Sequence, residues 1–153
     1  MKTYGNNLSN HILGTKVTKS KSAVLDGVQN VIFTIAGGRV LITHLEGEIC
    51  DAAVDTEGAT VKFVFNPTVG SDSDMCATAD LNAAPIGTTF SISGVPGDAL
   101  VFDTGITPGM VRTGLSLAEG TIDVLSGGDN DAGGAKAKFE LWYIPLDEGA
   151  VVS

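Results

Sequence analysis

The chain is poor in the residues that most often build catalytic and metal centres. Its 153 residues include two histidines, two cysteines and one tryptophan. His11 and His44 belong to no His-x-His or His-x-x-x-His spacing, so a zinc site is not expected. Cys50 and Cys76 are too few for a disulfide framework and do not form a recognisable nucleophile pair; whether they pair stays open. We therefore expect no metal and no cofactor.

Long apolar runs and basic residues are also scarce. No run approaches the roughly 20 residues of a membrane helix, and the first residues lack the apolar core of a secretory signal. We therefore expect a soluble protein of intracellular synthesis, without a membrane partner. The chain has nine Lys and Arg and 18 Asp and Glu, which gives a net charge of −9. Such a body repels phosphate backbones, so nucleic-acid binding is not expected.

The few basic residues are unevenly placed. Lys2, Lys16, Lys19 and Lys21 lie in the first 22 residues, where there is no Asp or Glu. We interpret residues 1–22 as a basic N-terminal arm and residues 23–153 as one domain. Two interpretations of the arm stay open: an ordinary solvated terminus, and an arm that docks on an acidic neighbour.

Strand-like runs recur along the chain with turn residues between them. They cover residues 28–35, 39–49, 60–66, 88–93, 98–103, 121–125 and 135–146. No window of ten residues keeps a helical period, although Asp80–Ala84 is compatible with one helical turn. The pattern predicts an all-β protein, a single-domain β-sandwich, jelly roll or barrel of about 8–10 strands. Gly37-Gly38 fits a tight hairpin between two of these strands.

Alternation within the runs predicts which side chains form the core. The predicted core positions are Val31, Phe33, Ile35, Val61, Phe63, Phe65, Phe90, Ile92, Ile122 and Val124. On the same grounds His44 shares a strand face with Ile42 and Glu46, where we expect a partly buried, hydrogen-bonded imidazole.

The most informative segment is the strand that begins at Ala135. One face carries Ala135, Ala137, Phe139, Leu141 and Tyr143, and the other begins with Lys136, Lys138 and Glu140. This second face then becomes apolar at Trp142 and Ile144. A strand whose polar face turns apolar predicts a surface that something covers: a neighbouring subunit, another protein, or a loop of the same chain.

Two local motifs resemble known sites. Phe102-Asp103-Thr104-Gly105 resembles the signature of retropepsin-like aspartic proteases, in which two such aspartates from a dimer share a proton. The alternative is that Asp103 simply starts a turn after a strand. The acidic, glycine-rich segment 127–134 resembles a calcium loop, but it occurs once and lacks the flanking elements of an EF-hand. A solubilising hairpin loop is the interpretation that we prefer.

Three segments together carry a wider resemblance. They are residues 75–82 (MCATADLN) running into 87–94 (GTTFSISG), residues 120–123 (GTID), and residues 142–151 (WYIPLDEGAV). Over roughly the last eighty residues the chain resembles small proteins of tailed bacteriophages that are encoded near the major capsid protein. The resemblance implies a capsid decoration, or cement, protein: a β-rich, commonly trimeric module on the outer shell of the virion, made in the host cytoplasm.

On this basis we expect a non-enzymatic virion structural protein that binds the major capsid protein and stabilises the shell. The residues expected to contact partners are Lys16, Lys19 and Lys21 of the arm, with Trp142 and Ile144 of the last long strand. Two alternatives stay open: a tail- or fibre-associated β-sandwich that binds a host glycan, and a dimeric retropepsin-like protease that uses Asp103.

Overall fold

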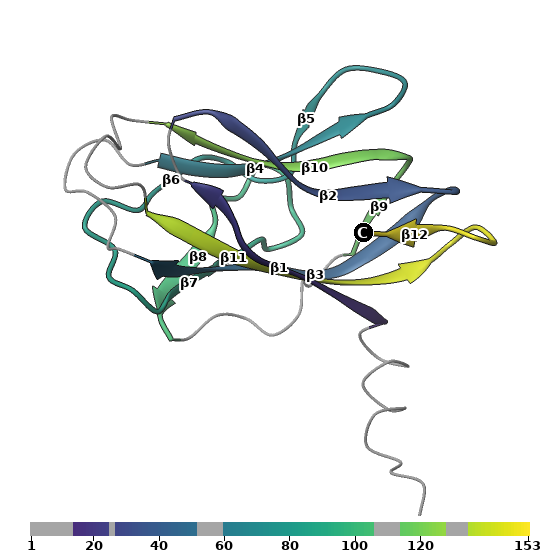
Figure 1. The fold of residues 1–153 in the computed structure, drawn as a ribbon. Helices are drawn as coiled ribbons and strands as arrows, with labels where there is room; N and C mark the ends of the chain where they lie inside the picture. The colour runs from purple at the N-terminus through teal and green to yellow at the C-terminus, as the bar shows by residue number, and fades with distance from the viewer. Residues whose placement is uncertain (1–13, 25–26, 52–59, 106–113, 128–134) are drawn as a thin grey trace, which may run out of the picture.

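The computed structural model describes residues 14–24, 27–51, 60–105, 114–127 and 135–153, with the backbone alone for 20–24. Two antiparallel sheets pack face to face and enclose one hydrophobic core (Figure 1). The predicted β-sandwich is therefore confirmed. Within the described residues there is no helix, and so none long and apolar enough to cross a membrane.

The described residues form twelve strands. They are β1 (Thr15–Val24), β2 (Gln29–Ala36), β3 (Val40–Asp51), β4 (Thr60–Pro67), β5 (Ser73–Asp74), β6 (Ala79–Asp80), β7 (Thr88–Ser91), β8 (Val101–Thr104), β9 (Leu115–Leu117), β10 (Gly120–Gly127), β11 (Lys136–Pro145) and β12 (Val151–Val152). The count exceeds the predicted 8–10 because β5, β6, β9 and β12 are only two or three residues long.

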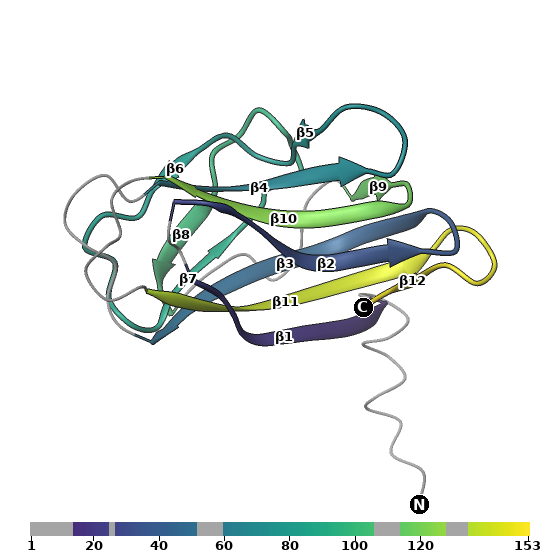
Figure 2. The same ribbon diagram turned by 45° about the horizontal axis from the view of Figure 1, so that its top comes forward.

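Each sheet holds six strands. Sheet A has the order β1-β11-β3-β7-β8, with β9 also paired to β3; sheet B has the order β12-β2-β10-β4-β5, with β6 also paired to β4. Figure 2 shows β1 along the outer edge of sheet A, beside β11. Residues 15–22, which we assigned to an arm on charge alone, thus form most of an edge strand, and the sandwich begins before residue 23. Residues 1–13 of the predicted arm lie outside the described residues.

Aromatic rings join the two sheets at the centre of the core. Phe63 of sheet B and Phe90 and Phe139 of sheet A are fully buried, with ring centroids 5.9–6.1 Å apart. Phe90 and Phe139 meet edge to face, an arrangement that aromatic quadrupoles favour. Gly47 of β3 lies directly beneath these two rings, where a side chain has no room. The buried faces of β4, β7, β10 and β11 are those that the alternation predicted.

Two bulges change the prediction for particular side chains. The β2–β10 register shifts between Ile122 and Asp123, so Ile32 is buried at 1% exposure while Val31, a predicted core residue, is 57% exposed. The β3–β11 register shifts between Trp142 and Tyr143. His44 therefore shares the outer face with Trp142, and not the face of Ile42 as alternation predicted. One extra residue in a strand moves every side chain beyond it to the other face of the sheet.

The hairpin at Gly37-Gly38 and the turn after β11 are held together by hydrogen bonds. Gly37 and Gly38 have φ of +76° and +130°, as the predicted hairpin requires. The Arg39 backbone N–H and guanidinium both donate to the Asp147 carboxylate, which ties this hairpin to the turn after β11. These hydrogen bonds lower the pKa of Asp147 to about 2. Asp80–Ala84 is not helical: Ala84 N–H donates to Leu81 at 3.0 Å, and Ala83 has φ of +57°.

Candidate functional site

The outer face of sheet A carries a row of paired charges across β1, β11 and β3. Lys16 Nζ lies 2.7 Å from Glu140 Oε2 and Lys138 Nζ lies 2.7 Å from Glu48 Oε2. Lys136 Nζ lies 3.1 Å from Asp51 Oδ2. These pairs form because β11 runs between the other two strands, so that its polar side chains lie beside theirs on the same face of the sheet. We call this surface, with Trp142 and Ile144 at its other end, the outer face of sheet A.

Trp142 lies between two side chains of the neighbouring strands. Lys16 Nζ is 4.8 Å from the centre of the indole ring, a distance at which the ring quadrupole attracts a cation. The His44 and Trp142 ring centroids are 5.0 Å apart. His44 is 3% exposed, and its Nε2 lies 2.9 Å from Glu46 Oε2. Trp142 is half-buried, so its own chain covers part of the ring and leaves part open.

The structure separates the five residues that we expected to contact partners. Lys16 and Trp142 are register partners, and Ile144, also half-buried, lies farther along the same face of β11. Lys19 pairs in register with the core residue Phe139, so it lies on the opposite side of β1 from Lys16. Lys21 belongs to β1, but its side chain lies outside the described residues. Of the predicted group, the structure therefore places Lys16, Trp142 and Ile144 on one face of sheet A and Lys19 on the other.

The paired charges order this surface more than they stabilise the fold. Their side chains are 30–50% exposed, and exposed ion pairs contribute only about 0–1 kcal/mol each. The hydrogen bond to Glu48 raises the pKa of Lys138, so that lysine stays charged. Since cations and anions alternate, the face offers no single-sign patch for a polyanion. An apolar end beside ordered polar side chains suits a complementary protein surface.

The described residues offer little support for a metal site or for a reactive cysteine. They contain no cluster of three or more His, Cys, Asp or Glu placed to hold a metal ion. The acidic segment 128–134 lies outside them. Cys50 and Cys76 are both free thiols, and burial raises the pKa of Cys76 to about 11. A thiol with such a pKa is a poor nucleophile at neutral pH.

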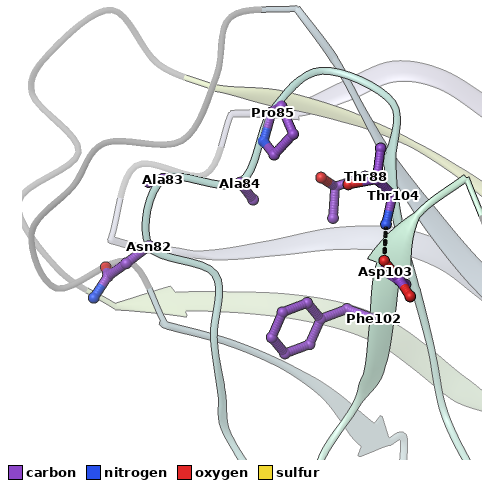
Figure 3. Close-up of a pocket in the computed structure, with 8 residues that line it drawn as sticks. All are labelled: Asn82, Ala83, Ala84, Pro85, Thr88, Phe102, Asp103 and Thr104. Carbon is purple, nitrogen blue, oxygen red and sulfur yellow. Dashed lines mark hydrogen bonds between the residues drawn. The ribbon is translucent and has the colours of Figure 1, made fainter.

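Asp103, the residue of the protease-like motif, lies in the edge strand β8. All four β8 residues are exposed, and Asp103 Oδ1 accepts a 2.6 Å hydrogen bond from the Thr104 N–H. Beside this strand is a pocket of about 240 Å³ that Figure 3 shows between Phe102 and the Ala84–Pro85 segment. The sequence placed Phe102 only in the protease-like motif and gave no sign of a pocket beside it. The edge position of β8 leaves this side chain 45% exposed.

His44 and Glu46 were also missed as parts of the outer face. Their i, i+2 spacing on one strand was the available signal, but the bulge that brings His44 beside Trp142 leaves no trace in the sequence. Comparisons of the chain with protein-family models, curated proteins and solved structures gave no match.

Proposed function

We propose that this chain is a structural protein of a bacteriophage virion, a decoration protein that binds the outer capsid shell and stabilises it without catalysis. The resemblance of its last eighty residues to such proteins supports the proposal. The observation that carries it is the outer face of sheet A, where Trp142 and Ile144 stay half-buried beside paired charges. Contact with the major capsid protein would bury the remainder of both side chains.

The arrangement around Trp142 lowers the cost of docking. Lys16 is already held by Glu140 and by the indole ring, so it loses little rotamer freedom when a partner arrives. Tryptophan anchors of this kind contribute most to binding when neighbouring side chains exclude water around them. Added contact area across the joints between capsomers then resists their separation. The net charge of −9 keeps copies on the same shell from adhering to one another.

Co-sedimentation with capsids assembled from the major capsid protein of the same genome tests the proposal. Trp142→Ala should weaken binding by about tenfold or more, as truncation of an interface anchor does. Lys62→Ala is a control for a substitution outside this face, because Lys62 lies on sheet B, where its Nζ is 2.7 Å from Asp74 Oδ1. It should bind like the unmodified protein. Undiminished binding by Trp142→Ala removes this face from the interface, and no affinity of the unmodified protein for capsids overturns the function.

The N-terminal segment needs a separate variant. Deleting residues 1–22 would remove most of β1 and uncover one edge of β11, so a loss of binding would not distinguish a contact from a damaged fold. Deleting residues 1–13 leaves β1 intact. We expect this deletion to weaken capsid binding, and equal binding by the shortened protein would show that residues 1–13 do not contact the capsid. We also propose a homotrimer, which sedimentation velocity of the purified protein tests; a monomer contradicts it.

A further inference from the structure

The pocket beside β8 has two opposite walls and a polar base. Phe102 pairs in register with the core residue Phe90, so its ring lies on the inner side of sheet A at the open edge of the sandwich. Ala84 and Pro85 form the facing wall, and Thr88 lies between them (Figure 3). The facing wall is held in place: Ala84 N–H donates to Leu81 at 3.0 Å, and Thr88 N–H to Pro85 at 3.1 Å.

Thr88 supplies the observation that points to a ligand. It is 2% exposed, lines the pocket, and its hydroxyl has no hydrogen-bond partner in the described residues. Leaving a buried hydroxyl unpaired is unfavourable, so a ligand that offers a hydroxyl, directly or through one water, gains affinity here. An apolar ligand leaves this group unsatisfied.

Charge and size narrow the ligand further. Asp103 follows Phe102 in the strand, so its carboxylate lies on the other face of β8, and Figure 3 shows it turned away from Phe102 and Pro85. Asp103 is the one charged residue among those that line the pocket, and its Oδ1 is held by the Thr104 N–H at 2.6 Å. The walls formed by Phe102, Ala84 and Pro85 carry no charge, so the ligand is expected to be neutral. The volume of about 240 Å³ is below the roughly 300–1,000 Å³ of most small-molecule sites. It accommodates a single ring.

A peptide strand is the main competitor, because β8 is an edge strand. Strand addition requires free backbone N–H groups along the edge. Gly105 N–H donates to the Gly87 carbonyl, on the β7 side, so the preceding Thr104 N–H points to the open edge. This N–H already donates to the Asp103 carboxylate and is not free to pair with a peptide. An inserted apolar side chain would also leave the Thr88 hydroxyl unpaired. Both observations favour a ligand with its own hydroxyls over a peptide.

We propose that this pocket binds one ring of a neutral saccharide. The C–H face of the ring packs on Phe102, the opposite face on Pro85, and a ring hydroxyl pairs with the Thr88 hydroxyl. This activity goes beyond the proposed capsid function and does not depend on it, because the pocket lies at the β8 edge of sheet A and Trp142 lies beside the β1 edge. A decoration protein with such a site would attach the virion to a glycan-bearing surface.

Titration of ¹⁵N-labelled protein with the methyl glycosides of glucose, galactose, mannose and N-acetylglucosamine tests the proposal. At least one should shift the amide resonances of Thr88 and Phe102 in a saturable manner, with a dissociation constant of about 1 mM for so small a ligand. Phe102→Ala should weaken binding about tenfold by removing the aromatic wall. Thr88→Val keeps the shape of the side chain and should weaken binding about fivefold by removing the hydroxyl.

Val101→Ala is the matched control. Val101 is 40% exposed, close to the 45% of Phe102, but its side chain lies on the opposite face of the same strand. It should bind within about twofold of the unmodified protein. Should Phe102→Ala fail to fold, Phe102→Leu removes the aromatic face and keeps an apolar side chain. Equal effects of the Phe102 and Val101 variants, no shift with any glycoside, or shifts of these amides with N-acetyl-leucine amide alone would each overturn the proposal.

Discussion

Gly47→Ala tests the packing that joins the two sheets. A Cβ at this position would lie 2.3 Å from Phe90 Cζ and 3.0 Å from Phe139 Cε1. Non-bonded carbon atoms pack no closer than about 3.5 Å, so Phe90 would have to move by roughly 1.2 Å. Its ring already packs against Phe63 and Phe139 and is fully buried, so the movement would displace both neighbours.

We expect this substitution to lower the free energy of unfolding by about 3 kcal/mol, the upper part of the range for overpacked cores. For a domain of this size the midpoint of thermal unfolding falls by roughly 6–12 °C. Backbone propensity predicts the opposite sign, because alanine in a strand interior is favoured over glycine by about 0.5–1 kcal/mol. The sign of the change therefore distinguishes packing from propensity.

Urea unfolding followed by the emission of Trp142, the one tryptophan of the chain, measures the change. Gly97→Ala is the control, since a Cβ there meets nothing within 4 Å; it should be neutral or slightly stabilising. In the double variant Gly47→Ala/Phe90→Leu the smaller side chain makes room for the methyl group. Its loss should be at least about 1 kcal/mol less than the sum of the single losses. A loss below about 1 kcal/mol for Gly47→Ala, or simple additivity, would refute this account of the core.

Two further predictions concern titratable groups. The pKa of Asp147 is lowered to about 2 by its hydrogen bonds to Arg39, so its contribution to stability is complete above the unfolded value near 4 and is lost as pH falls through 2. Asp147→Asn should therefore flatten the fall in thermal midpoint between these pH values; an unchanged slope contradicts the assignment. Burial raises the pKa of Cys76 to about 11, whereas Cys50 is half-buried. At pH 8 a thiol reagent should modify Cys50 alone in native protein and both after unfolding, and comparable native rates would contradict the burial of Cys76.

The long strands were predictable because each carries its own alternation. Runs predicted at 60–66 and 135–146 correspond to β4 and β11 within one residue at each end. Short strands such as β5 and β12 were not predictable, since two residues hold no period and are fixed only by their partners, β4 and β2. β1 was misassigned because its lysines outweighed the Thr15–Val17 alternation. An edge strand tolerates such charges, which also discourage pairing with other chains.

The candidate site was predictable only in part. The change of the outer face of β11 from polar to apolar at Trp142 and Ile144 was predictable from the sequence alone. The partners of Trp142 do not, because Lys16 and His44 come from distant parts of the chain and the β3 bulge decides that His44 faces outward. The Thr88 pocket was beyond prediction for the same reason: its walls come from the loop before β7 and from an edge strand whose position local sequence does not specify.

The place of β11 between β1 and β3 has a consequence for synthesis. β1 ends at residue 24 and β3 at residue 51, but the strand that joins them begins at residue 136. During translation the edges of β1 and β3 that pair with β11 therefore stay unpaired until β11 has left the ribosome. Sheet A is completed only near the end of synthesis. Such non-local pairing is slow and exposes nascent chains to aggregation. The lysines of β1 then have a role before the protein is folded. Their like charges disfavour pairing of the unpaired β1 segment with the same segment of a neighbouring nascent chain.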